Sequence, residues 1–216
     1  MKKIYILCFL FCSLSFASQA QVRLGVKGGA NLSFLIYDPD ITFDNRPSIG
    51  FHLGGFAHFQ VANRFGVQTE VLYTTLGGRA EGEFTQNGVT IQQEVTDNFN
   101  YIAIPIMIKY TSPSGFTAEV GPSINFLIKA EETIEESSGG QNLSTDIDLD
   151  EIIRGTDFML GFGLGYELPS GLSFNGRFSF SLSDIFDTDS DFVSPDAPEL
   201  RNAVFQLGVG FPVFGN

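Results

Sequence analysis

The sequence predicts an all-β fold, an eight-stranded antiparallel up-and-down transmembrane β-barrel. Three observations support this prediction. Apolar residues alternate with small or polar ones through eight segments, which is the period of a strand with two different faces. The connections between the segments alternate between short and long. The chain has 24 glycines, 23 phenylalanines and no tryptophan, which suits a β-rich protein better than a helical one.

The N-terminal end is typical of a secretory signal peptide. Two lysines at the start are followed by an apolar run over 4–16 and by small residues around a cleavage site at 18–20. The apolar run is too short to span a bilayer comfortably, which disfavours an uncleaved anchor. We therefore assign 1–20 to a signal peptide and 21–216 to the barrel domain.

The mature chain has little scope for thiol chemistry or for binding polyanions. Its only cysteines, Cys8 and Cys12, lie in the expected signal peptide, so we expect no disulfide and no thiolate. Removing that peptide leaves ten basic and 25 acidic residues. This negative balance disfavours nucleic acid and anionic lipid headgroups as partners. We also expect no cofactor.

The strands are expected where the alternation is regular. We place them at 22–34, 48–60, 65–77, 99–111, 116–129, 156–168, 172–183 and 201–214.

The connections between these segments sort by length to opposite ends of the sheet. The short ones, 61–64, 112–114 and 169–171, consist largely of turn-forming residues. The long ones are 35–47, 78–98, 130–155 and 184–200. An even number of strands with short turns at one end and long loops at the other is the pattern of outer-membrane barrels.

The first three segments place charges and histidines on the inward face. By parity, Arg23 and Lys27 point inward from the first segment, His52 and His58 from the second, and Glu70 from the third. The two histidines are six residues apart, roughly 20 Å along a strand, too far to share a metal ion. We interpret them as residues that fill the lumen.

The fourth segment contains "YIAIPIMIKY", with four isoleucines on its outward row and Lys109 on its inward row. Pro105 has no N–H for the ladder that a closed barrel requires. If Tyr110 opposes Phe116 across the turn, then Pro105 opposes Gly121. We therefore expect a shared bulge or kink at this height.

The remaining segments repeat the pattern of an apolar row opposite a small or polar one. Glu119 points inward from the fifth segment, Asp157 and Glu167 from the sixth, and Arg177 from the seventh. In the eighth, a row that begins at Phe205 alternates with glutamine and glycine.

Alternation alone does not separate a membrane barrel from a soluble lipocalin-type barrel with its apolar row inside. The outward rows, however, are almost purely Phe, Ile, Leu and Val, and the inward rows are small enough for the crowded lumen of eight strands. Aromatic residues also lie beside the short turns, where membrane barrels have an interfacial girdle. These are Phe59, Phe65, Tyr110, Phe116 and Phe174.

Motifs along the mature chain resemble a known family. They include "VRLGVKGGANLSFL", "VQTEVLYTTLGGR", "YIAIPIMIKY", "EVGPSINFLIKA", "GRFSFSLSDIF" and "VFQLGVGFPVF". Together they are similar to the PorT-like outer-membrane β-barrel proteins, often described as porin family proteins. The resemblance implies an eight-stranded barrel in the outer membrane of a Gram-negative cell. Because the namesake is implicated in protein secretion, it also implies a link to secretion, but it assigns no chemistry.

The inward charges balance and form the candidate site. The basic residues are Arg23, Lys27, Lys109 and Arg177, and the acidic ones are Glu70, Glu119, Asp157 and Glu167. A charge in a narrow lumen requires a partner, so we expect a salt-bridged network that fills the barrel. We expect Arg177, Glu70 and Lys27 at its centre. A gated or selective pore is the alternative.

The long loops are acidic. The connection 130–155 has eight acidic residues and one arginine, and "EESSGGQNLS" within it is expected to be flexible. "DLDEIIRGTDF" is expected to form a helical turn over the barrel mouth.

The stretch "DTDSD" holds Asp187, Asp189 and Asp191 at the alternate spacing that opens a calcium loop. Phe192 stands where the loop needs glycine, and Pro198 where it needs glutamate. The EF-hand match therefore fails, and these aspartates remain a weak candidate for a divalent cation.

The leading functional hypothesis is a non-enzymatic outer-membrane protein whose acidic extracellular loops serve interaction, assembly or envelope structure. Its partners would be outer-membrane lipid and proteins of an envelope or secretion complex. A narrow porin-like channel is the alternative. A third hypothesis is an envelope enzyme with His52 or His58 as base, although no catalytic set can be assembled from the sequence.

Overall fold

The structure is a computed structural model that describes residues 22–38, 45–86, 89–138, 141–187, 190, 194 and 198–215. The expected signal peptide lies outside these residues. The strands are β1 (Val22–Asp38), β2 (Asn45–Ala62), β3 (Phe65–Gln86), β4 (Val89–Thr111), β5 (Phe116–Ser138), β6 (Gln141–Asp148), β7 (Thr156–Glu167), β8 (Ser173–Ser181) and β9 (Glu199–Phe214). No helix among the described residues is long and apolar enough to cross a bilayer.

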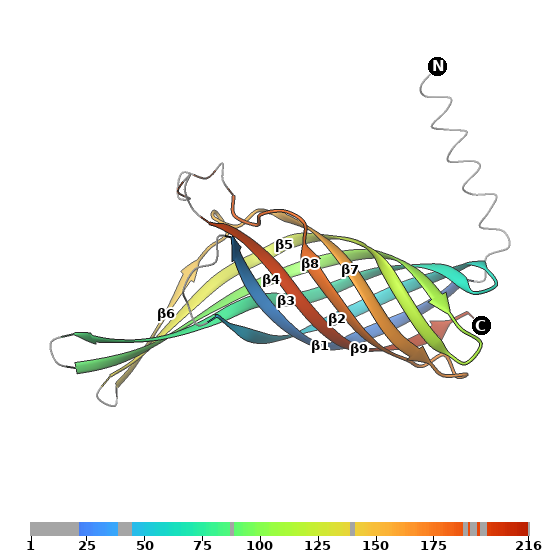
Figure 1. Ribbon diagram of the computed structural model, residues 1–216, viewed down its shortest axis with the longest axis horizontal. Coiled ribbons are helices and arrows are strands. Elements are labelled where there is room, and N and C mark those ends of the chain that lie inside the picture. Colours follow the sequence, from blue (N-terminus) through green and yellow to red (C-terminus); the bar gives the residue numbers. More distant parts are fainter. Residues whose placement is uncertain are drawn as a thin grey trace, which may run out of the picture.

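Eight of these strands close a barrel (Figure 1). The hydrogen-bonded order is β4-β3-β2-β1-β9-β8-β7-β5, and a further pairing of β4 with β5 completes the ring. Neighbours in the ring pair antiparallel, and β1 meets β9 where the chain ends join. The predicted eight-stranded antiparallel barrel is confirmed. β6 pairs with β5 alone, beyond the wall.

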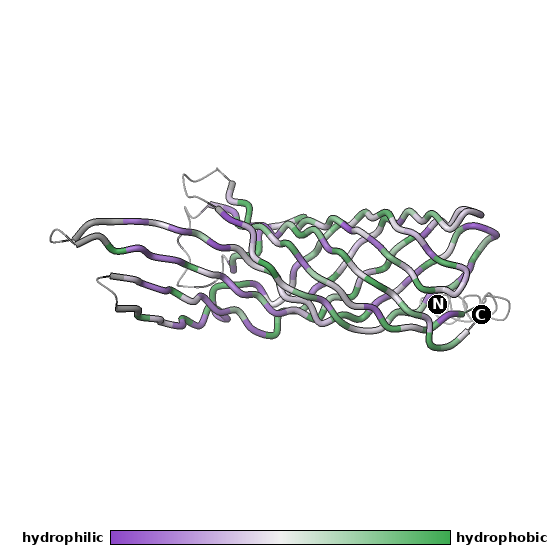
Figure 2. The backbone as a smooth tube through the Cα atoms, turned by 90° about the horizontal axis from the view of Figure 1, so that it is seen from below, coloured by the Kyte–Doolittle hydropathy of each residue, from purple (hydrophilic) through white to green (hydrophobic). Residues whose placement is uncertain are grey.

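The barrel is apolar outside and polar inside. Leu53, Phe162 and Phe211 are 61%, 52% and 52% exposed, whereas Arg177 and Glu70 are 2% and 1% exposed. The hydropathy colours of Figure 2 accordingly alternate along the barrel strands. A soluble barrel would bury the apolar rows and solvate the charged ones. So large an apolar outer surface requires an apolar surrounding such as lipid.

Aromatic side chains flank the short turns, as the sequence predicts. The rings of Phe65 and Tyr110 lie 5.2 Å apart between centroids, on neighbouring strands beside the short-turn end. Phe116 and Phe174 are also exposed near that end. This arrangement matches an interfacial girdle.

Two of the predicted long loops are mostly strand. β3, β4 and β5 are 22, 23 and 23 residues long, so they extend through most of 78–98 and well into 130–155. The stretch expected to be flexible, 135–144, is also strand except for 139–140, which lies outside the described residues. The prediction was wrong because these segments alternate charged residues with isolated valines and isoleucines, which gives a weak hydropathy period in a chain of good β-formers.

The extended strands form what we call the projecting sheet, residues 81–86, 89–98, 131–138 and 141–148. β2 pairs with β3 only as far as Ala80, so beyond that point the strands leave the wall. The order within the projecting sheet is β3-β4-β5-β6. Its hairpins extend past the long-loop end of the barrel in Figure 1.

The register of β4 against β5 differs from the predicted one by two residues. Tyr110 pairs with Ala118 rather than with Phe116, and Pro105 pairs with Ser123 rather than with Gly121. The cause is the turn: Ser112 N donates to Phe116 O over 2.8 Å. The loop therefore spans three residues and ends on Gly115 with a φ of 91°, a common hairpin geometry. A shift of two residues preserves the face of every side chain.

The predicted bulge at Pro105 is not present. The ladder omits the partners of Ile106 and Met107 next to Pro122, but it resumes at Ile108 and Val120 in the same register. Each proline lacks a donor, so pairs are lost without the insertion of an extra residue. The β4–β5 irregularity lies instead between Asn100 and Tyr101.

Candidate functional site

Arg177 occupies the centre of the lumen and contacts two carboxylates. Its Nη1 and Nη2 donate to Glu70 Oε2 and Oε1, each over 2.8 Å, and its Nε donates to Glu119 Oε1 over 2.8 Å. The three residues come from β8, β3 and β5, so the contacts bridge separate parts of the wall. A guanidinium bound to a carboxylate through two parallel hydrogen bonds is a strong and directional pair.

Lys27 and Gln68 complete the coordination of Glu70. Lys27 Nζ lies 3.0 Å from Glu70 Oε1, and Gln68 Nε2 donates to the same oxygen over 2.7 Å. With Arg177 and Glu119, the central cluster has two positive and two negative charges, all buried. The structure thus brings together the three residues expected at the centre. Gln68 was missed, although its inward parity two residues before Glu70 could have indicated it.

A second cluster lies nearer the short-turn end. Glu167 on β7 pairs with Arg23 on β1 and with Lys109 on β4, whose Nζ lies 3.1 Å from Glu167 Oε2. These side chains are 9–21% exposed, more than those of the central cluster. One carboxylate therefore holds two cations at the short-turn mouth.

Asp157 does not join either cluster. It lies opposite Asn125 at the long-loop end of β7, ten residues from Glu167. Its Oδ2 accepts hydrogen bonds from Ser181 Oγ (2.9 Å) and Asn202 Nδ2 (3.0 Å), and no ion pair joins it to a cation among the described residues. The predicted placement of Asp157 with the cations was wrong because parity gives the face of a residue but not its height along the barrel.

A neutral layer lies between the central cluster and Asp157. Asn31 Oδ1 accepts from Gln206 Nε2 (3.1 Å) and lies 2.7 Å from His52 Nδ1, and Asn31 Nδ2 donates to Thr74 Oγ1 over 2.9 Å. His58, the second histidine, is buried beside Gln60. Both histidines therefore fill the lumen.

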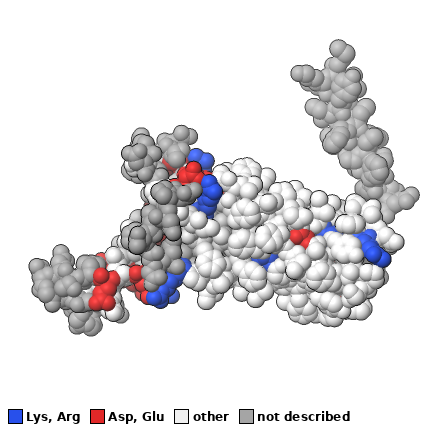
Figure 3. All heavy atoms as spheres, viewed as in Figure 1, with Lys and Arg blue, Asp and Glu red and all other residues white. Residues whose placement is uncertain are grey.

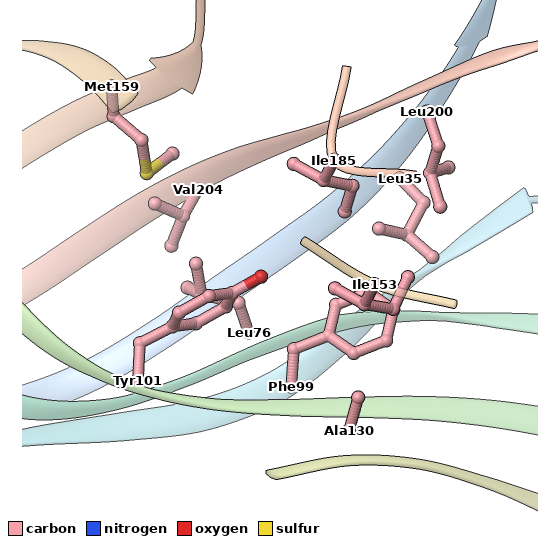
Figure 4. Packing of buried hydrophobic residues seen from close by; sticks show 10 residues of the cluster. All are labelled: Leu35, Leu76, Phe99, Tyr101, Ala130, Ile153, Met159, Ile185, Leu200 and Val204. Atoms are coloured by element: carbon pink, nitrogen blue, oxygen red, sulfur yellow. The ribbon is translucent and has the colours of Figure 1, made fainter. Parts of the chain in front are cut away.

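An apolar cluster, which we call the apolar cap, closes the long-loop end of the lumen (Figure 4). Ile153 and Ile185 enter it from the connections before β7 and after β8, and both are buried. Ile153 N donates to Leu149 O over 3.1 Å, which confirms the predicted turn over the mouth. The members are Leu35, Leu76, Phe99, Tyr101, Ala130, Ile153, Met159, Ile185, Leu200 and Val204.

Little space remains in the lumen on either side of the central cluster. A cavity of about 20 Å³ is lined by Thr74, Arg177 and Gln206 among others. A second, of about 10 Å³, lies beside Lys27 and Glu119. Each could hold about one water molecule, and neither is wide enough for a hydrated ion. The described side chains therefore obstruct the lumen over several layers.

Charge outside the barrel is concentrated at its ends. In Figure 3 most of the barrel wall is uncharged, and acidic side chains gather over the hairpins that extend past it. Among the described residues, no group of three His, Cys, Asp or Glu side chains could hold a metal ion. Of the weak cation candidates, Asp187 donates its N–H to Ile152 O, and Asp189 and Asp191 lie outside the described residues.

Asp97 lies on the inner row of β4. It is on the long-loop side of the outward row of isoleucines that begins at Ile102. Its cross-strand neighbour on β5 is Glu132. Burial, and to a lesser extent the charge of Glu132, raises the pKa of Asp97 to about 7. Burial also raises the pKa of Glu132.

This raised pKa predicts a pH dependence of stability. Between the pKa of an unfolded aspartate, about 4, and about 7, the folded protein binds more protons than the unfolded chain, so the free energy of unfolding falls as the pH rises. We expect Asp97→Asn to flatten this slope and to stabilise the protein at pH 8 by about 1–2 kcal/mol, allowing for partial solvent screening. Urea unfolding in lipid at several pH values measures the free energy of unfolding. Asp146→Asn, at an exposed position, is the control. Equal slopes for the wild type and Asp97→Asn would contradict the prediction.

The family comparison agrees with this architecture. A family model described as an outer membrane protein beta-barrel domain matches residues 16–187. Ail, the attachment invasion locus protein of Yersinia pestis, is 13% identical with a TM-score of 0.45, covering 89% of this chain and 99% of its own. Neisserial surface protein A is 12% identical with a TM-score of 0.40 and coverages of 87% and 96%.

The outer membrane protease OmpT from Escherichia coli is 10% identical, with a TM-score of 0.38 and coverages of 89% and 95%. No curated protein matches the chain in sequence.

Proposed function

The chain belongs to the outer membrane protein beta-barrel domain family and is an integral outer-membrane β-barrel protein, and we propose that it is a closed barrel that presents its projecting sheet to a partner outside the cell. The observation that carries this proposal is that the lumen is obstructed while three wall strands continue beyond the wall. A channel needs an open lumen, whereas a support for binding needs a rigid wall and an exposed surface.

The partner would belong to the cell envelope or to a secretion complex. The PorT-like motifs support this part of the proposal, because the namesake of that family is implicated in protein secretion. The N-terminal signal peptide is part of the same proposal, since it would deliver the chain across the inner membrane.

An enzymatic role is not part of the proposal. His52 and His58, the bases that the sequence offered, are 1% and 2% exposed and lie among lumen-filling side chains. A general base must come within hydrogen-bond reach of a substrate, and neither imidazole offers such access.

Conductance tests the proposal. The protein, purified from outer membranes, is checked for a heat-dependent gel shift, which reports a folded barrel, and is then added to planar bilayers. We expect the shift without steady single-channel currents. The double variant Ile153→Ser with Ile185→Ser should open the apolar cap but leave the central cluster intact. We therefore expect it to show no steady single-channel currents either. Steady currents from the wild type would overturn the proposal and establish transport.

A further inference from the structure

We propose that the free edge of β6 binds an extended, basic segment of another protein by adding it as a further strand. This inference rests on the proposed function, because it names the kind of partner that the projecting sheet would take. It is carried by the backbone geometry of β6, by the absence of lysine, proline and bulges from this edge strand, and by the charge around it.

β6 is the last strand of the sheet. It pairs with β5 along its whole length, from Ser138–Gln141 to Glu131–Asp148, and no described strand pairs with its other side. Every β6 side chain from Leu143 to Asp148 is exposed, and Leu143 is 68% exposed. An edge strand in this position presents unpaired N–H and C=O groups to an incoming chain.

The hydrogen-bond pattern identifies which groups are free. Leu149 N donates to Ala130 O over 2.9 Å, one position beyond the β5–β6 ladder and in its register, so Leu149 faces β5 as a residue of a hydrogen-bonded pair does. The second bond of such a pair is replaced here, because Ala130 N donates to Asp150 Oδ1 over 2.6 Å. Because such pairs alternate along an antiparallel ladder, Leu143, Thr145 and Ile147 direct their backbone groups to β5. The backbone groups of the residues between them point to the free edge. These are Asn142, Ser144, Asp146 and Asp148.

β6 lacks most of the usual features that prevent edge pairing, and its only charged residues are Asp146 and Asp148. Natural edge strands are short, or they carry charged side chains, lysine above all, or proline or a bulge. β6 has eight residues, contains neither lysine nor proline, and keeps one register with β5. Leu143 and Ile147 add an apolar row that an added strand would cover.

Charge selects the partner. Between Ala130 and Glu151 the chain has eight acidic residues and no basic one. A cleft of about 630 Å³ adjoins the strand, and its charged lining is five carboxylates and one arginine. These are Glu81, Glu83, Glu94, Glu135, Glu136 and Arg46. A strand of alternating basic and apolar residues would face opposite charges and cover the apolar row.

The same charges disfavour a second copy of this chain as the occupant. Antiparallel pairing of two β6 strands would bring Asp146 and Asp148 of one copy close to the acidic residues of the other. Like charges across a strand pair are destabilising. The occupant is therefore a different protein.

A synthetic peptide of about eight residues that alternates lysine and valine is the probe, and the target is the protein in lipid nanodiscs. We expect binding to the wild type and at least tenfold weaker binding to Ser144→Pro. The proline removes an N–H on the free edge and leaves the bonds to β5, as edge positions tolerate. Ser144→Ala, the matched control, retains the N–H and should bind like the wild type.

A second measurement does not depend on the folding of a variant. The same peptide with alternate backbone nitrogens methylated keeps its charge but cannot pair as a strand. We expect it not to bind the wild type. Equal binding of both peptides, or equal binding to Ser144→Pro, would mean attraction by charge alone and would overturn the inference. So would the absence of binding, or dimerisation of the wild type that Ser144→Pro abolishes.

The two proposals fail in distinguishable ways. A silent barrel in planar bilayers that does not bind the peptide through β6 refutes the inference and leaves the closed barrel standing. A conducting barrel that binds the peptide in a Ser144-dependent manner refutes the closed barrel and leaves the β6 edge as a binding site.

Discussion

Arg177→Ala is expected to lower the free energy of unfolding of the barrel by about 3–5 kcal/mol, the usual cost of leaving a buried ion pair without one partner. The substitution removes all three guanidinium hydrogen bonds in the central cluster. Glu70 would then keep Lys27 and Gln68, whereas Glu119 would lose the hydrogen bond that it accepts from Arg177. In a lumen whose two cavities could each hold about one water molecule, solvent cannot replace the lost donors.

Urea unfolding in lipid, followed by the heat-dependent gel shift, measures this effect. Lys129→Ala is the control, because Lys129 is 50% exposed and its pair with Glu131 should contribute less than about 1 kcal/mol. A double variant, Arg177→Met with Glu70→Gln, restores charge balance and should unfold closer to the wild type than Arg177→Ala does. An unchanged midpoint for Arg177→Ala would show that the charges of the cluster are not coupled in this way.

The central cluster illustrates how far strand parity can predict a site. Parity correctly predicts that Arg177, Glu70 and Lys27 point into the lumen. Parity alone does not give the height of a residue along the barrel, because that depends on the register of each strand pair. The register in turn depends on turn geometry, such as the left-handed Gly115 between β4 and β5. Asp157 has the predicted face but lies at the long-loop end of β7, away from the cations.

The limits of the fold prediction have a related cause. In the barrel wall, one face of each strand contacts an apolar surrounding and the other faces a polar lumen. Apolar and polar residues therefore alternate strongly along the wall strands. Toward its hairpin ends the projecting sheet has water on both faces, and its strands read as loops apart from residues such as Val95 and Ile134. The ring was therefore predictable from hydropathy, whereas β6, the strand of greatest interest for binding, was not.

The neutral partners were the other omission. Asn31 accepts and donates across three strands, yet asparagine in a strand is usually read as a turn or edge residue. In the lumen of a membrane barrel the opposite holds, because the buried polar side chains of the inward rows must form hydrogen bonds with one another. Inward asparagine and glutamine next to inward charges are thus the signal to use in such a chain.

Closure of the barrel depends on Gly29, and Gly29→Val is expected to prevent it in most molecules. A Cβ atom at this position would lie 1.9 Å from Leu207 O and 2.7 Å from Gly208 Cα, both backbone atoms of β9. Gly29 pairs with Gly208 in the middle of the β1–β9 ladder, where the first and last strands join. The conflict is with backbone, so no side-chain rotamer relieves it, and β1 and β9 would have to separate.

Separation is costly here because no water in the apolar band can replace the ladder bonds. We expect Gly29→Ala to destabilise the barrel by about 3 kcal/mol, the upper end of overpacking, and Gly29→Val to leave most of the chain without the heat-dependent gel shift. Gly55→Ala is the matched control, because the nearest atom to its Cβ would be 3.5 Å away, an ordinary contact. A Gly29→Ala barrel with the midpoint of Gly55→Ala would mean that β1 and β9 meet in another register, so that Lys27 and Glu70 would no longer be held at the height of Arg177.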